Sequence, residues 1–282
     1  MIYIGLTGWG DHDSLYTNKK ERNKLSVYSS FFPVVEVDTS FYAIQPIRNA
    51  EKWVKDTPLG FQFIVKAYNE MTLHSRGKTN FESREVMFQA FIESLEPYIA
   101  SNKLAMVLFQ FPPWFSCTRE NVLYLRWVKQ KMKDIPCALE FRHSSWFVDG
   151  MREKTLHFMK EEGWIHSICD EPQAGTTSIP TVLQATTCDK TLIRMHGRNV
   201  YGWNKREHEN WRDVRYLYRY NEKELNEWKQ NLKVLKKQSK DLYLLFNNNS
   251  GGDAADNAKM MIELLGIQYE GLAPRQLDLF AE

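Results

Sequence analysis

Apolar runs of strand length recur along the chain, and stretches with helical spacing separate them. The apolar runs lie at about residues 2–7, 34–38, 61–66, 104–111, 137–142, 164–168, 191–196 and 241–246. Their intervals average roughly thirty-odd residues, the length of one βαβ unit. Because eight parallel strands close into a barrel, the pattern predicts an α/β fold: a single (β/α)₈ TIM-type barrel over residues 1–270, with a short tail over 271–282.

The stretches between the apolar runs differ in character. Residues 222–237 are amphipathic, with lysines on one side and an apolar stripe on the other formed by Leu225, Trp228, Leu232 and Leu235. Residues 170–190 contain two prolines and many threonines, which oppose a long helix, so an extended loop or a short helix is predicted there. The connections 67–80 and 197–221 exceed ordinary loop lengths, and such loops are more often functional than accidental.

Composition sets the broad class of protein. With 43% hydrophobic and 26% charged residues, the 282-residue chain can bury a core without disulfides or metals. Its four cysteines form no C-x-x-C pair, which indicates a reducing, cytoplasmic location. No segment approaches the roughly 18 apolar residues of a membrane helix. A net charge of +2 gives no global argument for nucleic acid, so any such argument has to be local.

Charged residues occupy alternate positions in three of the predicted strands. They are Glu36 and Asp38 in the second strand, Glu140 and Arg142 in the fifth, and Arg194 and His196 in the seventh. Side chains alternate between the two faces of a strand, so the charged set is predicted to point into the barrel and the apolar set toward the helices. All six positions lie near the C-terminal strand ends, where barrel enzymes build their active sites.

These charges suggest both a network and a site. Unpaired buried charges cost several kcal/mol each, so the acidic residues Glu36, Asp38 and Glu140 are expected to pair with Arg142, Arg194 and Lys66. A fully paired network that only fills the barrel is the structural alternative. If the site functions, its basic side chains are suited to clamp a phosphate or a carboxylate.

Specific roles follow from this chemistry. We predict Glu140, His196 and Asp38 as catalytic candidates, since carboxylates and imidazoles move protons when their pKa lies near neutrality. The predicted ligand-binding residues are Trp9, Glu36, Tyr42, Lys66, Arg142, His143, Arg194, Asn247 and Asn248. A single histidine at a strand end is more often structural than catalytic. No spacing specifies a metal site, and the sequence identifies no cofactor.

Aromatic and polar loops add to the same end of the barrel. Trp9 and Tyr42 could stack on a base or a sugar, or could simply pack under the loops. Residues 203–220 interleave basic and aromatic side chains, which suits either a phosphate backbone with stacked bases or a helix with a basic face. The turn 248–252 precedes a helix predicted from about Asp253, the position where many barrels hold phosphate.

The C-terminal tail carries a separate signal. Pro274 opposes a helix, and the apolar side chains that follow need a surface to cover them. The barrel itself is one such surface. The alternative is a partner protein, because residues 276–280 (QLDLF) resemble the peptide by which bacterial repair and replication proteins dock on the DNA sliding clamp. The predicted partner-binding residues are Gln276, Leu277, Leu279 and Phe280.

Four separated motifs resemble one known family. They are residues 35–42 (VEVDTSFY), 138–143 (ALEFRH), 194–198 (RMHGR) and 246–248 (FNN). Together they are similar to the YecE-like family, Domain of Unknown Function 72, over nearly the whole chain. The resemblance implies a TIM-type barrel and no particular reaction. The chain has Leu6-Thr7 where the family opening is closer to G-T-S-G-W, and Asn249 where a histidine often stands, so no role of that histidine is carried over.

Three functions are consistent with these residues. The leading hypothesis is a hydrolase or phosphodiesterase that acts on a phosphate-containing ligand and is recruited to the DNA sliding clamp by the tail. Nucleic acid is one of the candidate ligands. The second is a non-catalytic binding module recruited to replication or repair complexes by the tail. The third is a sugar-phosphate isomerase or lyase. The expected ligand is therefore an anionic small molecule or nucleic acid. The tail is expected to bind the sliding clamp, and no membrane partner is expected.

Overall fold

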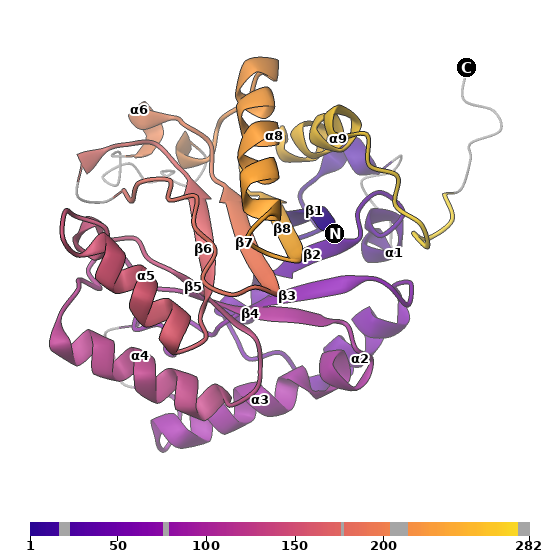
Figure 1. Ribbon diagram of the computed structural model, residues 1–282. Helices are drawn as coiled ribbons and strands as arrows, with labels where there is room; N and C mark the ends of the chain where they lie inside the picture. The colour runs from indigo at the N-terminus through magenta and orange to yellow at the C-terminus, as the bar shows by residue number, and fades with distance from the viewer. Residues whose placement is uncertain (17–22, 76–78, 176–177, 204–213, 276–282) are drawn as a thin grey trace.

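Eight parallel strands close into one barrel in sequence order, as the apolar periodicity predicts (Figure 1). The computed structural model describes residues 1–16, 23–75, 79–175, 178–203 and 214–275. The strands are β1 (Ile2–Thr7), β2 (Val34–Val37), β3 (Gln62–Lys66), β4 (Leu104–Gln110), β5 (Cys137–Glu140), β6 (Ile165–Asp170), β7 (Lys190–Met195) and β8 (Asp241–Phe246). No predicted strand end differs from these bounds by more than 2 residues.

Helices surround the barrel (Figure 1). The α-helices are α1 (Lys24–Tyr28), α2 (Ile47–Lys55), α3 (Arg84–Ala100), α4 (Arg119–Met132), α5 (Arg152–Glu161), α6 (Val200–Trp203), α8 (Glu222–Lys236) and α9 (Ala254–Leu265). Short 3₁₀ helices η1 (Asp13–Leu15), η2 (Thr39–Phe41) and η3 (Ser144–Trp146) follow strands β1, β2 and β5. None of the helices in the described ranges is long and apolar enough to cross a bilayer.

The boundaries of the outer helices follow from local chemistry. Asn221 and Glu224 form a capping box at the start of α8, each side chain bonding the backbone N–H of the other. The predicted stripe of this helix is buried: Leu225, Trp228, Leu232 and Leu235. The helix predicted from about Asp253 is α9, which begins after that residue. Between β6 and β7 the described residues contain no α-helix, as the prolines indicated.

The interior of the barrel has two levels. Toward the N-terminal strand ends it is an apolar cluster that includes Val34, Ile64, Leu108, Ala138, Ile165, Leu192, Tyr243 and Leu245. Charged residues stand above this cluster. Because Glu36 pairs in register with Thr7, and Glu140 with Gln110, the first charged positions of β2 and β5 lie at the C-terminal ends of their neighbouring strands. The barrel register thus carries the predicted charges to one end.

The chain after α9 returns to the start of the fold. Ala273 N–H donates to the carbonyl of Ser29 at 3.1 Å, and the Arg275 guanidinium lies 4.3 Å from the ring centroid of Phe31. Residues 271–275 therefore lie against the segment that follows α1. The clamp-like residues Gln276, Leu277, Leu279 and Phe280 fall outside the described residues, so their role stays a prediction.

Candidate functional site

Arg194 on β7 organises the centre of the barrel. Its Nε and Nη2 bond both oxygens of Glu36 at 2.9 and 2.8 Å, while Nη1 lies 3.1 and 3.0 Å from the two oxygens of Glu140. Glu36 and Glu140 are fully buried, and Arg194 is 1% exposed. Strand parity brought these three residues together across the lumen, and the predicted pairing of acids with arginines is confirmed for them.

A second arginine extends this network. Arg142 Nη2 lies 2.5 Å from an oxygen of Glu140, and its Nη1 donates to Glu171 at 2.6 Å. The other oxygen of Glu171 accepts the Ile179 N–H at 2.8 Å. Burial raises the pKa of Glu171 to about 7, against the lowering effect of Arg142. We call Glu36, Glu140, Arg142, Glu171, Arg194 and His196 the ionic layer.

His196 completes the ionic layer as a neutral ring. Its Nε2 lies 2.9 Å from Arg142 Nη2, and its Nδ1 lies 2.9 Å from the side-chain amide of Asn247. Burial lowers the pKa of His196 well below its ordinary value, and the neighbouring Arg142 lowers it further. Arginine can only donate, so Nε2 accepts from Arg142, and a neutral ring then carries its proton on Nδ1, which bonds Asn247 with the amide turned to present its oxygen. The ring therefore has no nitrogen lone pair left for a ligand.

Glu140 is equally committed to its neighbours. It accepts hydrogen bonds from Ser167 and Arg194 in addition to its ion pair with Arg142. Burial alone would raise the pKa of Glu140, but the two arginines hold it well below its ordinary value. A fully buried carboxylate with that pKa is a poor proton donor or acceptor at neutral pH. The geometry favours a structural role for Glu140 and His196 over the catalytic one predicted from sequence.

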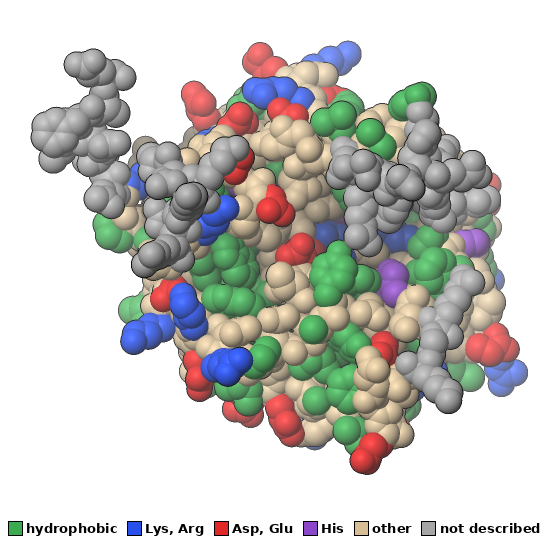
Figure 2. Space-filling view, turned by 180° about the vertical axis from the view of Figure 1, so that it is seen from behind, with side chains coloured by type: hydrophobic (Ala, Val, Ile, Leu, Met, Phe, Trp, Pro, Cys, Tyr) green, Lys and Arg blue, Asp and Glu red, His purple; other side chains and the backbone are tan. Residues whose placement is uncertain are grey.

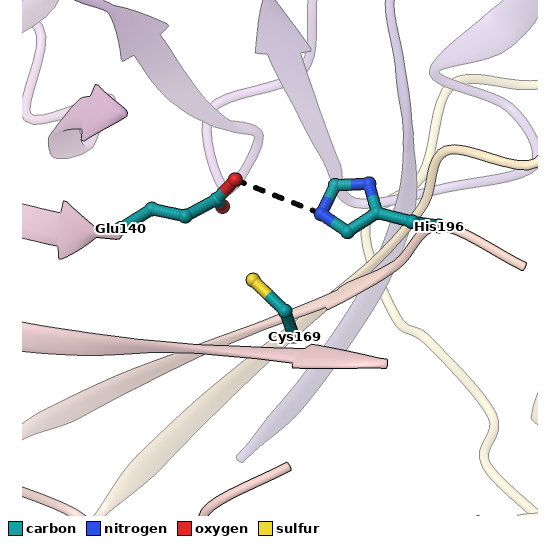
Figure 3. Close-up of side chains that lie close together, drawn as sticks. All are labelled: Glu140, Cys169 and His196. Atoms are coloured by element: carbon teal, nitrogen blue, oxygen red, sulfur yellow. Dashed lines mark ion pairs between the residues drawn. The ribbon is translucent and has the colours of Figure 1, made fainter. Parts of the chain in front are cut away.

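The same side chains form the one group of three metal-ligand types found among the described residues. Glu140, Cys169 and His196 offer ligand atoms that all lie within 4.8 Å of one another (Figure 3). Two guanidinium groups already contact Glu140, and one donates to His196. Burial raises the pKa of the Cys169 thiol well above its ordinary value, which disfavours the thiolate that binds metals. These surroundings disfavour a cation.

A pocket of about 700 Å³ lies above the ionic layer. Arg142 and Arg194 line it, whereas Glu36, Glu140 and His196 do not. The other lining residues come from the loops after the strands and from the strand ends: Thr7, Asp11, Asp38, Phe41, Tyr42, Lys66, His74, Gln110, Pro113, Trp114, Arg215, Tyr216, Asn247, Asn249 and Ser250. Figure 2 shows basic side chains set back among hydrophobic side chains and a histidine near the middle of one face.

Lys66 differs from the arginines beside it. Within the described part of the chain, its ammonium has no carboxylate within ion-pair distance and no hydrogen-bond partner. Its recorded contact is the ring of Phe41, whose centroid lies 4.6 Å from Nζ. Burial and the adjacent Arg194 lower the pKa of Lys66. The predicted pairing is therefore wrong for Asp38 and Lys66: Asp38 follows the last residue of β2, and neither side chain comes within ion-pair distance of an opposite charge among the described residues.

Asp38 is the catalytic candidate that reaches the pocket. It lines the cavity, and its carboxylate is not held by an arginine of the ionic layer. Burial raises the pKa of Asp38, and Lys66 opposes that rise. A carboxylate with a raised pKa beside an open cavity can exchange a proton with a bound molecule. Of the predicted ligand-binding residues, Tyr42, Lys66, Arg142, Arg194 and Asn247 also line the pocket.

Besides Glu36 in the ionic layer, three predicted ligand-binding residues lie outside the pocket lining. Trp9 packs edge-on against Trp53, with ring centroids 5.1 Å apart. His143 caps η3 by accepting the Ser145 N–H. Asn248 is fully buried, and its amide donates to the Tyr218 carbonyl and to Asn257. None of the three lines the pocket, because their side chains support the loops behind it.

Sequence reasoning did not select several residues of the site. Glu171 was missed because the sixth strand was ended too early, although its position continues the alternation of Ser167 and Cys169. His74 and Trp114 lie in loops without a periodic signal. Arg215 and Tyr216 belong to the basic and aromatic stretch 203–220, of which residues 204–213 lie outside the described part.

Comparison with known proteins identifies the family. The family model described as "Protein of unknown function DUF72" matches residues 3–278. The chain belongs to the DUF72 family. The UPF0759 protein YunF of Bacillus subtilis is 67% identical to this DUF72 protein over 282 residues, covering 99% of this chain and 100% of YunF.

Solved structures of other DUF72 family members share this barrel. A DUF72 protein from Enterococcus faecalis V583 superposes with a TM-score of 0.93 at 40% identity, covering 99% of this chain and 100% of its own. A DUF72 protein from Thermotoga maritima MSB8 gives a TM-score of 0.81 at 30% identity, covering 95% and 100%. The family resemblance read from the four motifs is confirmed, and with it the TIM-type barrel.

Proposed function

We propose that this protein binds a phosphate-containing small anion in the pocket above the ionic layer. The observation that carries the proposal is Lys66, a desolvated ammonium that lines the pocket and has no carboxylate partner among the described residues. Lys66 is half-buried, and a partly desolvated charge without a partner is destabilising. An anion at Lys66 would supply the missing partner, so binding relieves a cost that the free protein bears.

The neighbouring groups suit a phosphate. Arg142 and Arg194 line the same cavity and are held in fixed orientations by their carboxylates, so the charge that each presents to the cavity is fixed in place. Asn247, Gln110 and Thr7 add neutral polar groups to the lining. This mixture of fixed cations and amides is the chemistry that proteins use for phosphate oxygens.

A hydrolytic reaction on such a ligand would use Asp38. It is the predicted acid–base residue that reaches the cavity, and burial raises its pKa, which makes the carboxylate a stronger base than an exposed aspartate. Phosphodiester hydrolysis is the reaction we propose to test, in which Asp38 takes a proton from the attacking water.

Binding is tested by isothermal titration calorimetry of the full chain with inorganic phosphate. We expect saturable binding by the wild type and a loss of roughly tenfold or more in Lys66→Met, since charge-assisted hydrogen bonds contribute about 1.5–3 kcal/mol each. Lys55→Met on α2, an exposed lysine, is the matched control and should bind as the wild type does. Equal affinities in all three proteins would contradict the proposal.

Catalysis is tested separately with bis(4-nitrophenyl) phosphate. Asp38→Asn should lower the rate about 10²–10⁴-fold while phosphate binding persists, if Asp38 is the base. Binding without turnover of this substrate would leave the non-catalytic binding module as the better description. Isomerisation of a sugar phosphate without diester cleavage would favour the isomerase or lyase alternative.

A second proposal concerns the tail: we propose that residues 276–280 dock on the DNA sliding clamp. The support is the QLDLF sequence, with Gln276 as the polar anchor and Leu279 and Phe280 as apolar anchors. The preceding Arg275 is held at Ser30 and Phe31, on the outside of the barrel and away from the pocket lining. The full chain should bind to immobilised bacterial clamp, and Phe280→Ala should bind at least tenfold more weakly. Phe158→Ala on α5 is the control and should bind as the wild type does. Indistinguishable responses would refute it.

A further inference from the structure

One side of the pocket is built from aromatic rings that come from the loops after three neighbouring strands. Tyr42, Phe41, His74 and Trp114 follow one another with ring centroids 5.4, 4.9 and 6.0 Å apart, and all four line the cavity. We call these four residues the aromatic wall. Tyr42 is 62% exposed and Trp114 is 45% exposed, so large ring surfaces face water at a concave site.

The aromatic wall is held in place by backbone contacts from several loops. Trp114 Nε1 donates to the Leu73 carbonyl at 3.3 Å, which fixes the indole ring. Leu73 itself has a φ of 59°, a left-handed conformation that a leucine rarely adopts. Asn69 ties this loop to η2 by donating to the Phe41 carbonyl at 2.8 Å. A strained residue retained beside a pocket indicates a surface positioned for contact.

The aromatic wall is also uncharged. Burial lowers the pKa of His74 to about 3, and the nearby Lys66 and Arg142 lower it further. Its ring therefore stays neutral at physiological pH and joins the other rings as an aromatic surface. The ammonium of Lys66 lies 4.6 Å from the centroid of the Phe41 ring. The basic side chains of the pocket and the aromatic wall are therefore in contact.

We infer that the anion held by this pocket is a nucleotide, with its phosphate at Lys66, Arg142 and Arg194 and its base stacked on Trp114 and Tyr42. The inference rests on the proposed anion site and adds the rest of the ligand. A cavity of about 700 Å³ is far larger than a phosphate ion needs, and falls in the range of sites for larger organic ligands. A nucleotide joins a phosphate, which suits the basic side chains, to a planar base, which suits the aromatic wall. Gln110 and Asn249 supply amides that can bond the edge of a base.

The experiment compares three ligands that differ by one component each. The full chain is titrated with inorganic phosphate, ribose 5-phosphate, and AMP or CMP, by calorimetry and by quenching of tryptophan fluorescence. Stacking a base on an aromatic side chain should tighten AMP or CMP over ribose 5-phosphate by roughly 5- to 100-fold. Trp114→Ala should remove that advantage without altering phosphate affinity. Trp114→Phe should retain most of it, and Phe158→Ala on α5 serves as the remote control.

The outcomes separate this inference from the proposed function. Phosphate binding that depends on Lys66, together with equal affinities for AMP and ribose 5-phosphate, would overturn the nucleotide inference and leave the anion site standing. Preference for ribose 5-phosphate over AMP would indicate a sugar phosphate and would also overturn it. Absence of binding by all three ligands would refute both. If Trp114→Ala does not fold, Tyr42→Ala provides the test: unchanged AMP affinity in this variant, together with no gain of AMP over ribose 5-phosphate, refutes the stacking.

Discussion

The two levels of the barrel interior solve the same packing problem by different means. The lower level fills the lumen with apolar side chains such as Ile64, Leu192 and Leu245, which are fully buried. The ionic layer above fills it with carboxylates and guanidinium groups that are just as buried. Apolar burial stabilises a fold side chain by side chain. Buried ion pairs stabilise only when every partner is present, because each charge alone is costly.

This contrast explains how the pocket keeps a cation available. Carboxylates occupy Arg194 and Arg142, so both guanidinium groups are fixed and their charges are balanced. Lys66 lines the pocket above this layer and has no such partner in the described chain. The ionic layer thus works as a rigid floor, and Lys66 is the group whose charge remains for a ligand.

The largest expected effect comes from breaking the ionic layer at its centre. Glu140→Ala would leave Arg142 and Arg194 each short of a carboxylate in a buried setting, and should lower the free energy of unfolding by about 3–5 kcal/mol. Leu192→Ala in the lower level should cost about 2–5 kcal/mol by leaving a cavity. Urea denaturation of both variants measures the difference, and exposed Glu161→Ala is the control. A loss under 1 kcal/mol for Glu140→Ala would show that the layer tolerates unpaired charge.

A smaller effect concerns pH and tests how the ionic layer is charged. Burial raises the pKa of Glu171 to about 7 in the folded protein, above the ordinary value of 4.5. The stability this residue contributes is therefore complete below pH 4.5 and is lost as the pH rises through 7. Glu171→Gln, which mimics the protonated acid, removes this dependence. The difference in unfolding free energy between the two proteins should change by about 3 kcal/mol between pH 4.5 and 7.5. A constant difference would mean that Glu171 is ionised throughout, paired with Arg142.

The smallest expected effect distinguishes Lys66 from the arginines. Lys66→Met should change the free energy of unfolding by less than about 1 kcal/mol or stabilise the fold, because it removes a desolvated charge without orphaning a carboxylate. Arg194→Met should instead cost about 3–5 kcal/mol, since Glu36 and Glu140 lose their shared partner. Thermal and urea unfolding in phosphate-free buffer provide the comparison. Similar losses in both variants would place Lys66 within the network.

The pattern of the chain determined the barrel and much of its interior. Strand length, spacing and alternation are local properties, so eight strands and the inward direction of Glu36, Glu140, Arg142, Arg194 and His196 could be predicted. If the alternation of Ser167 and Cys169 in the sixth strand had been followed two residues further, it would have added Glu171 to this set. The four family motifs implied the same fold independently of periodicity.

Tertiary structure decided which of these residues form the floor and which form the cavity. Arg194 bonds to Glu36, which lies 158 residues away in the sequence, and both side chains are buried beneath the pocket. The aromatic wall comes from three loops whose directions depend on contacts such as Trp114 with Leu73. Local sequence encodes the face on which a side chain lies, because that follows from backbone geometry. Its depth, partners and exposure depend on segments distant in the chain, and only the closed barrel brings these together.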